Sequence, residues 1–126
     1  MPSSPDLAAQ LAAVRDRSTC RITTQGRKTG KPHTVTIWFL VEDGTIYLAT
    51  LDPRRDWVRN LEKTPEVVLE FADLHVRGRV STVDAALEAH IGRLLAQKYW
   101  MAWLGSWFGK GAARAFRVDG IEPVAR

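Results

Sequence analysis

The residues with the clearest chemical potential form a short basic loop, Gly26-Arg27-Lys28-Thr29-Gly30-Lys31. Phosphate groups are held by backbone N–H groups that glycine leaves accessible, together with ammonium, guanidinium and hydroxyl groups. The loop offers all of these within six residues. It is not a Walker A loop, because only three residues separate its glycines and Pro32 follows the lysine. The loop therefore suggests an anion site, and a solvent-exposed turn is the alternative.

A second basic cluster, Asp52-Pro53-Arg54-Arg55-Asp56, follows a predicted strand. In an antiparallel meander, the start of the second strand and the end of the third lie at the same end of the sheet. We therefore expect Arg54 and Arg55 to reach the same ligand as the basic loop, and Thr50 to add a hydroxyl and an N–H group. Two converging cationic loops favour an anion site over an exposed turn. Trp57 is expected to pack in the core beneath this corner.

The sequence contains none of the common catalytic or metal-binding motifs. Its three histidines lack the HExxH spacing, and a single cysteine cannot form a CxxC pair. No serine lies in a GxSxG turn. Cys20 precedes a strand and is expected to be a packed thiol rather than a nucleophile. No metal is expected and no catalytic side chain is assigned, so an enzyme of this sequence would take its chemistry from a bound cofactor.

The composition predicts one domain, residues 1–126, in the cytoplasm. A chain of 126 residues that is 45% hydrophobic can form one core. The net charge of +4 suits phosphate-bearing ligands, nucleic acid or an anionic membrane surface. The single cysteine excludes an intrachain disulfide and favours a reducing compartment. The N-terminus lacks the features of a secretory signal, and no apolar stretch approaches the roughly 20 residues of a membrane span.

The hydrophobic pattern predicts six strands with helices before, between and after them. The expected strands are residues 21–25, 33–41, 46–51, 66–72, 74–83 and 113–118, and the expected helices are residues 6–16, 54–63 and 84–98. Asp43-Gly44 predicts a tight turn, and Asp119-Gly120 is expected to turn the chain into its tail. The predicted hairpins near the start of the chain, and the lack of repeated strand–helix–strand units, favour an antiparallel α+β barrel over a doubly wound sheet.

The second expected strand, residues 33–41, has two different faces. Val35, Ile37, Phe39 and Val41 are expected to point into the barrel, and Thr34, Thr36, Trp38 and Leu40 lie on the other face. The second face changes from small to large residues and could form a floor for a planar ring. Cross-strand packing is the alternative for each of these residues.

Residues 99–108 include five aromatic residues, with three tryptophans at helical spacing. A helix that is apolar on most sides exposes more apolar surface than a small domain buries alone. We expect a homodimer contact or the wall of an apolar substrate pocket, with membrane contact as a lesser alternative. Nucleic-acid binding is not expected, because these aromatic residues do not interleave with the basic ones.

Three stretches within residues 19–83, TTQGRKTGKPHTVTIWF, DGTIYLAT and RDWVRNLEKTPEVVLEF, resemble one known family. They are similar to the flavin- and deazaflavin-dependent oxidoreductases of the split β-barrel superfamily, which includes deazaflavin-dependent nitroreductases and pyridoxamine-phosphate-oxidase-like proteins. The resemblance implies a six-stranded antiparallel split β-barrel that forms a homodimer. It also implies that coenzyme F-420, an 8-hydroxy-5-deazaflavin, or alternatively FMN, binds near the dimer interface.

The resemblance also assigns residues to this cofactor. The phosphate and its tail would meet Lys28, Thr29, Gly30 and Lys31, the ring would lie along Thr36, Ile37, Trp38, Ala49 and Thr50, and Arg54 and Arg55 would close the phosphate side. The expected reaction is hydride transfer from reduced F-420 to an apolar electrophile such as an enone, quinone or nitro compound, polarised by Tyr99 or by backbone N–H groups. The compact LDPRRDW connection differs from the longer, glycine-rich loop of the nitroreductases, so FMN remains open. A carrier of flavin or another apolar ligand without turnover is a further alternative.

Overall fold

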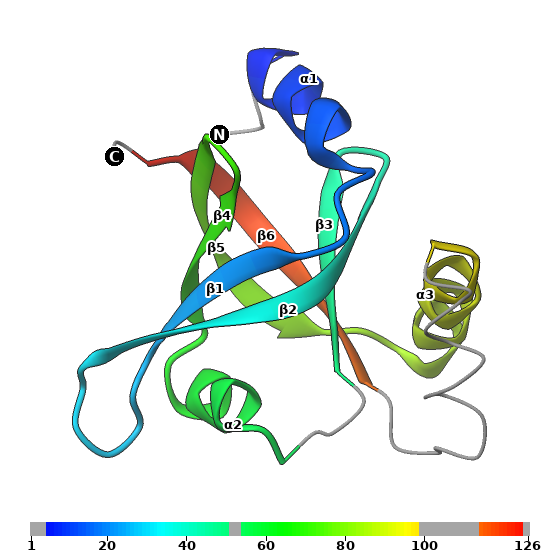
Figure 1. Cartoon of the computed structure of the whole chain (residues 1–126). Helices are drawn as coiled ribbons and strands as arrows, with labels where there is room; N and C mark the ends of the chain where they lie inside the picture. The colour runs from blue at the N-terminus through cyan, green and yellow to red at the C-terminus, as the bar shows by residue number, and fades with distance from the viewer. Residues whose placement is uncertain (1–4, 51–53, 99–113, 125–126) are drawn as a thin grey trace.

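The computed structural model describes residues 5–50, 54–98 and 114–124, which form a closed barrel of six antiparallel strands with three helices around it (Figure 1). The strands are β1 (Cys20–Gln25), β2 (Pro32–Glu42), β3 (Thr45–Thr50), β4 (Glu66–Phe71), β5 (Leu74–Thr82) and β6 (Arg114–Pro123), and the helices are α1 (Pro5–Val14), α2 (Asp56–Lys63) and α3 (Ala85–Lys98). The strand order is β1-β2-β3-β6-β5-β4, and pairing of β1 with β4 closes the barrel. The predicted six-stranded antiparallel split barrel is therefore confirmed.

Alternating apolar residues of the strands fill the barrel. Phe39 and Phe71 are completely buried, and their ring centroids lie 4.8 Å apart in an edge-to-face arrangement. Full burial of a side chain of this kind stabilises a fold by about 1.5–3 kcal/mol. Helices α1 and α2 lie at opposite ends of the barrel (Figure 1). Their buried apolar residues are Leu7 and Leu11 of α1 and Trp57, Val58 and Leu61 of α2, so the expected core position of Trp57 is confirmed.

Helix α3 lies outside the barrel against β2 and β6, beside β3 (Figure 1). Ile91 and Leu95 of α3 join Leu40, Ala49 and Ala115 in a second apolar cluster. Leu40 therefore packs against helix α3, whereas the sequence interpretation of its strand face expected cross-strand packing or contact with a ring. Asp84 caps the helix as predicted, because its Oδ1 accepts a hydrogen bond of 2.7 Å from the N–H of Leu87. No helix in the described ranges is long and apolar enough to span a membrane.

The last strand differs most from the sequence prediction. β6 does not end at the expected Asp119-Gly120 turn but continues to Pro123, which pairs with Val76. Gly120 adopts a φ of 62° within the strand, opposite a register shift between Arg77 and Arg79. The predicted turn is wrong because the glycine accommodates a strand irregularity instead of a chain reversal. The other predicted helix and strand bounds agree with the structure within two residues. The aromatic stretch 99–108 lies outside the described residues.

The outward start of β2 also corrects a prediction. Val35 was expected in the core, yet it is 41% exposed, and all of residues 32–36 are exposed. The β1–β2 hairpin extends beyond the body of the barrel (Figure 1), and β3 pairs with β2 only from Trp38 to Glu42, so no described strand pairs with residues 32–36 on that side. Val35 lies directly opposite the buried Ile22, but its side chain is exposed because this edge of β2 is not covered by β3.

Candidate functional site

The basic loop, residues 26–31, is a tight hairpin turn. The N–H of Gly26 donates to the carbonyl of Lys31 and that of Gly30 donates to the carbonyl of Gly26, both at 2.8 Å. The N–H of Lys31 donates to Thr29 Oγ1 at 3.2 Å, and Gly30 has a φ of 74°. The expectation of several accessible N–H groups is thus too broad. Within the described chain, the N–H groups of Lys28 and Thr29 are the two in this loop that have no acceptor.

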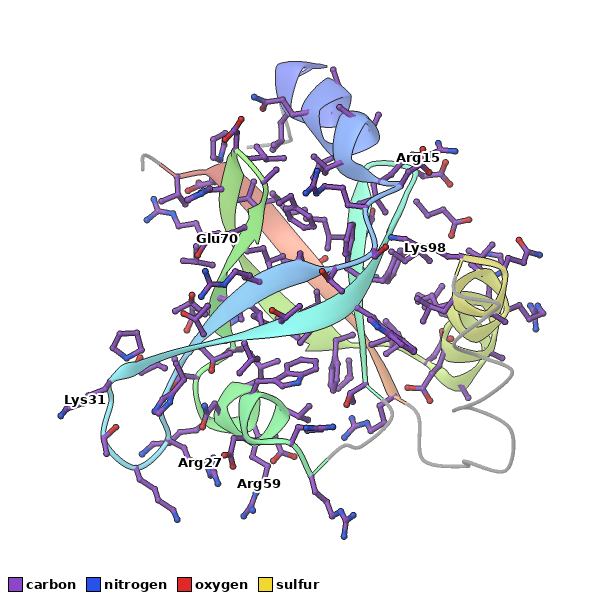
Figure 2. The ribbon with its side chains drawn as sticks, in the orientation of Figure 1. Arg15, Arg27, Lys31, Arg59, Glu70 and Lys98 are labelled. Carbon is purple, nitrogen blue, oxygen red and sulfur yellow. The ribbon has the colours of Figure 1, made fainter. Side chains whose placement is uncertain are left out.

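Arg27 fastens the loop to α2. Its N–H and Nη1 donate to Asn60 Oδ1 at 3.1 and 2.9 Å, and Nη2 lies 3.2 Å from Asp56 Oδ1. Lys63 Nζ donates to the carbonyl of Arg27 at 2.9 Å, and the Asn60 amide donates to Thr24 Oγ1 at 3.0 Å. Figure 2 shows Arg27 beside α2 and Lys31 on the outer side of the hairpin. These contacts hold the loop along the length of α2, from Asp56 to Lys63.

Asn60 is the residue of this network that the sequence prediction missed. It is 2% exposed, although it is polar, and it lies among the buried Trp57, Val58 and Leu61 of α2. A buried amide requires hydrogen-bond partners, so an asparagine on an apolar helix face is a signal of such a network. The sequence does not identify the partners, because Arg27 is 33 residues away.

A pocket of about 410 Å³, here called the aromatic pocket, lies between β2, β3 and the start of α2. It is lined by Val35, Thr36, Ile37, Trp38, Ala49, Thr50, Arg55, Asp56 and Trp57. The β2–β3 pairing places Trp38 opposite Ala49, which brings the strand segments together. Six of the predicted site residues therefore line one pocket: Thr36, Ile37, Trp38, Ala49, Thr50 and Arg55.

A second pocket of about 260 Å³, here called the basic pocket, lies between the basic loop and α2. It is lined by Gly26, Arg27, Lys28, Thr29, His33, Asp56 and Asn60, so it holds two more predicted residues, Lys28 and Thr29. Asp56 lines both pockets, which makes them neighbours. A ligand with a planar apolar part and an anionic tail can place one part in each pocket.

Three predicted residues lie elsewhere. Gly30 lines a larger cavity of about 600 Å³, which also includes Arg77 and Glu66 and so lies toward β4 and β5. Lys31 and Arg54 are exposed and line neither the aromatic nor the basic pocket. Among the arginines of the second basic cluster, the structure thus places Arg55, rather than Arg54, at the aromatic pocket.

Two displaced pKa values belong to groups outside both pockets. Burial raises the pKa of the Cys20 thiol to about 12, an effect that the nearby Lys98 ammonium opposes. Burial also lowers the pKa of Lys98 to about 8, and its Nζ donates to the carbonyl of Phe39 at 2.9 Å. Cys20 is 3% exposed, so the prediction of a packed thiol is confirmed. In the described part of the chain, no three His, Cys, Asp or Glu side chains gather as a metal-binding group.

The fold and pockets agree with a family comparison. The family described as pyridoxamine 5'-phosphate oxidase matches residues 7–123. The chain therefore belongs to this family, and the resemblance to the split-barrel flavin and deazaflavin oxidoreductases is confirmed. No curated protein sequence is significantly similar to the chain.

Solved structures show the same fold at low sequence identity. An F420-H2-dependent reductase, FDR-A, is 20% identical, with 82% of this chain and 95% of that one covered and a TM-score of 0.68. A structure described as a domain-swapped dimer is 21% identical, covers 82% and 81% of the two chains, and has a TM-score of 0.69. A heme-binding protein from Mycobacterium smegmatis is 13% identical, covers 99% of this chain and 59% of its own, and has a TM-score of 0.69. Two of these proteins of the same fold are thus described with different ligands, F420-H2 in one and heme in the other.

Proposed function

We propose that this protein is an oxidoreductase that binds reduced coenzyme F-420 and reduces a small apolar electrophile, such as an enone, quinone or nitro compound. One observation carries the proposal. The aromatic pocket contains the five residues that the resemblance assigns to the cofactor ring, together with Arg55, which it assigns to the phosphate side, and Asp56 lines both this pocket and the basic pocket. The fold shared with an F420-H2-dependent reductase supports the same cofactor class.

The lining residues fit such a cofactor. Trp38, Ile37 and Ala49 offer apolar surface for a planar ring, and Thr36 and Thr50 bring hydroxyl groups to its polar edge. Lys28 and Thr29 provide an ammonium group, a hydroxyl and two N–H groups for an anionic tail, and Arg55 lines the neighbouring aromatic pocket.

When bound, the cofactor would supply the hydride. The chain's own contribution would be to hold the ring, to keep water from its buried face, and to leave room for the acceptor about 3–3.5 Å away. The β2 and β3 walls are suited to this task because Ile37, Ala49 and Thr50 are buried parts of a paired sheet. No side chain of the described residues is assigned as a proton donor, and a role for Tyr99 remains a prediction.

FMN is the second candidate cofactor, and the match to the pyridoxamine 5'-phosphate oxidase family favours it. It also combines a planar ring with a phosphate, so it would use the same two pockets. A carrier without turnover is the third candidate. It is supported by the absence of an assigned acid–base group in the pockets and by the heme-binding protein of the same fold.

We further propose that the protein is a cytoplasmic homodimer without nucleic-acid partners. Residues 32–36 of β2 are exposed, and Val35 forms both an exposed apolar surface and part of the aromatic pocket wall. A second copy placed against this hairpin would cover Val35 and close the pocket. A protein of the same fold is described as a domain-swapped dimer, which supports self-association.

Titration of the purified protein with F-420 and with FMN tests the proposal. We expect dissociation constants in the micromolar range or below, measured by ligand fluorescence. Lys28→Ala and Arg55→Ala should each weaken binding about tenfold, as expected for loss of a charged contact to an anion. Arg93→Ala on the exposed side of α3 is the control and should bind like wild type. Absence of binding of both cofactors at micromolar concentration would exclude both oxidoreductase functions.

Oxidation of the bound F-420 is the test of turnover. Reduced F-420 should regain its absorbance when an enone, a quinone or a nitro compound is added with the protein, and not with the protein alone. Tight binding without such oxidation by any of the three acceptor classes would favour the carrier.

A further inference from the structure

Asp56 is the residue that belongs to both pockets, and its charge is opposite to that of the cationic groups around it. Its Oδ1 contacts Arg27 Nη2 at 3.2 Å, and Oδ2 has no hydrogen-bond partner among the described residues. The side chain is 85% exposed. A ligand that spans from the aromatic pocket to the basic pocket must pass this carboxylate.

We infer that Asp56 makes the site selective for ligands that carry a hydroxylated chain between the planar ring and the anionic group. The inference rests on the proposed function, and it assigns a role to a residue outside the predicted set. An ionised carboxylate has acceptors and no donor, so hydroxyl groups are its natural neutral partners. Hydrogen bonds to a charged oxygen are also roughly twice as strong as neutral ones.

The same carboxylate disfavours a phosphate at the junction. Two anions in contact repel each other, and Arg27 compensates only one oxygen of Asp56. The anionic group is therefore directed past Asp56 toward Lys28 and Thr29, which line the basic pocket. The site thus imposes an order on its ligand: ring, hydroxylated chain, anion. A ring that carries its phosphate directly, or through a chain without hydroxyl groups, should bind poorly.

Riboflavin and lumiflavin provide a direct test, because they share one ring and only riboflavin carries the hydroxylated chain. Neither has a phosphate, so the basic pocket does not contribute. Both are titrated into wild type, Asp56→Ala, Asp56→Asn and Glu62→Ala, and the ratio of the two dissociation constants is the readout. Glu62 is an exposed acid on the same helix outside both pockets, which makes it the matched control. The same test on the F-420 ring uses two 8-hydroxy-5-deazaflavins, one with and one without the hydroxylated chain.

Wild type and Glu62→Ala should prefer riboflavin by about tenfold or more. Asp56→Ala should lose this preference, and Asp56→Asn should keep part of it because the amide oxygen still accepts. The dissociation constant of lumiflavin should change less than about twofold in all variants, which a general disturbance of the pocket would not produce. An unchanged preference in Asp56→Ala would overturn this inference and leave the proposed function standing. Failure of wild type to bind either ring, or FMN or F-420, would overturn both.

Discussion

At the scale of single residues, Asn60 accepts two hydrogen bonds from Arg27 and donates one to Thr24. Thr24 and Asn60 are both 2% exposed, so water cannot replace these bonds without opening the barrel end. This explains why the arginine of the basic loop has a structural role, whereas Lys28 one residue later faces the basic pocket. The position of the loop therefore depends on an uncharged side chain of α2.

We predict that Asn60→Ala lowers the free energy of unfolding by about 3 kcal/mol, because it leaves a buried hydroxyl and an N–H group without partners. Urea unfolding followed by circular dichroism measures this change. Arg59→Ala, the exposed neighbour on the same helix, should alter stability by less than about 0.5 kcal/mol. Equal effects of the two substitutions would show that the network does not anchor the loop.

A pH dependence is expected from Lys98. Burial lowers the pKa of its amine from the ordinary 10.5 to about 8. Between these values the unfolded chain binds more protons than the folded one, so this group makes stability rise with pH. Cys20 acts in the opposite direction above pH 9, because burial raises its thiol pKa from 9.0 to about 12 and the unfolded thiol ionises first. The window from pH 8 to 9 therefore isolates Lys98.

The measurement compares urea unfolding of wild type and Lys98→Met from pH 7 to 9. Wild type should gain stability relative to Lys98→Met as the pH rises above 8, since the methionine side chain does not titrate. A difference between the two proteins that stays constant across this range would contradict the lowered pKa of Lys98.

At the scale of elements, β5 and β6 pack tightly at Gly78, which lines the cavity of about 600 Å³. A Cβ atom on Gly78 would lie 2.5 Å from Val118 Cγ1 and 3.0 Å from the carbonyl oxygen of Asp119. We predict that Gly78→Ala destabilises the protein by about 1–3 kcal/mol, because β5 and β6 must separate at the register shift. Thermal unfolding is the readout.

Gly92→Ala is the matched control, because no atom lies within 4 Å of its added Cβ and the residue is in the middle of α3. Alanine there should stabilise the helix by up to about 1 kcal/mol. Destabilisation by both substitutions would mean that the close approach at Gly78 is not the cause.

The elements differ in how far local sequence determines them. Asp43-Gly44 predicts its own turn, because both residues adopt positive φ angles of 52° and 74° as a primed hairpin requires. Antiparallel pairing then suffices to place the end of β3 beside β2 at Trp38, which is why Trp38 and Ala49 could be expected at one pocket. The extent of β6 could not be predicted, because an Asp-Gly pair is typical of a turn. Only the pairing of β6 with β5 shows that the strand continues past Asp119-Gly120.

The hairpin that carries Val35 shows a similar limit. Alternation alone assigns Val35 to the core face with Ile37 and Phe39. Whether Val35 is covered depends on where β3 stops pairing with β2, which is set by residues further along the chain. The sequence also did not predict that Arg27 holds the basic loop against α2. Its partners, Asp56 and Asn60, follow it by about thirty residues, so no local pattern links them to it.

At the scale of the whole molecule, a single chain closes the barrel around its core but leaves residues 32–36 of β2 exposed. We predict a solution mass of twice 14.1 kDa by light scattering. Val35→Glu should shift the mass toward the monomer, because a charge in the covered surface would lose its water. Ala89→Glu, on the exposed side of α3, should leave the mass unchanged. A monomeric wild type at high micromolar concentration would refute the homodimer.

The account depends on one placement: the ring in the aromatic pocket and the anionic tail in the basic pocket. NMR titration of the ¹⁵N-labelled protein with F-420, and separately with FMN, tests this placement directly. The account predicts that the largest amide shifts occur at Thr36, Trp38, Ala49, Thr50 and Arg55, with a second group at Lys28 and Thr29. Shifts concentrated instead around Arg77, Gly78 and Gly120, which line the larger cavity, would contradict it.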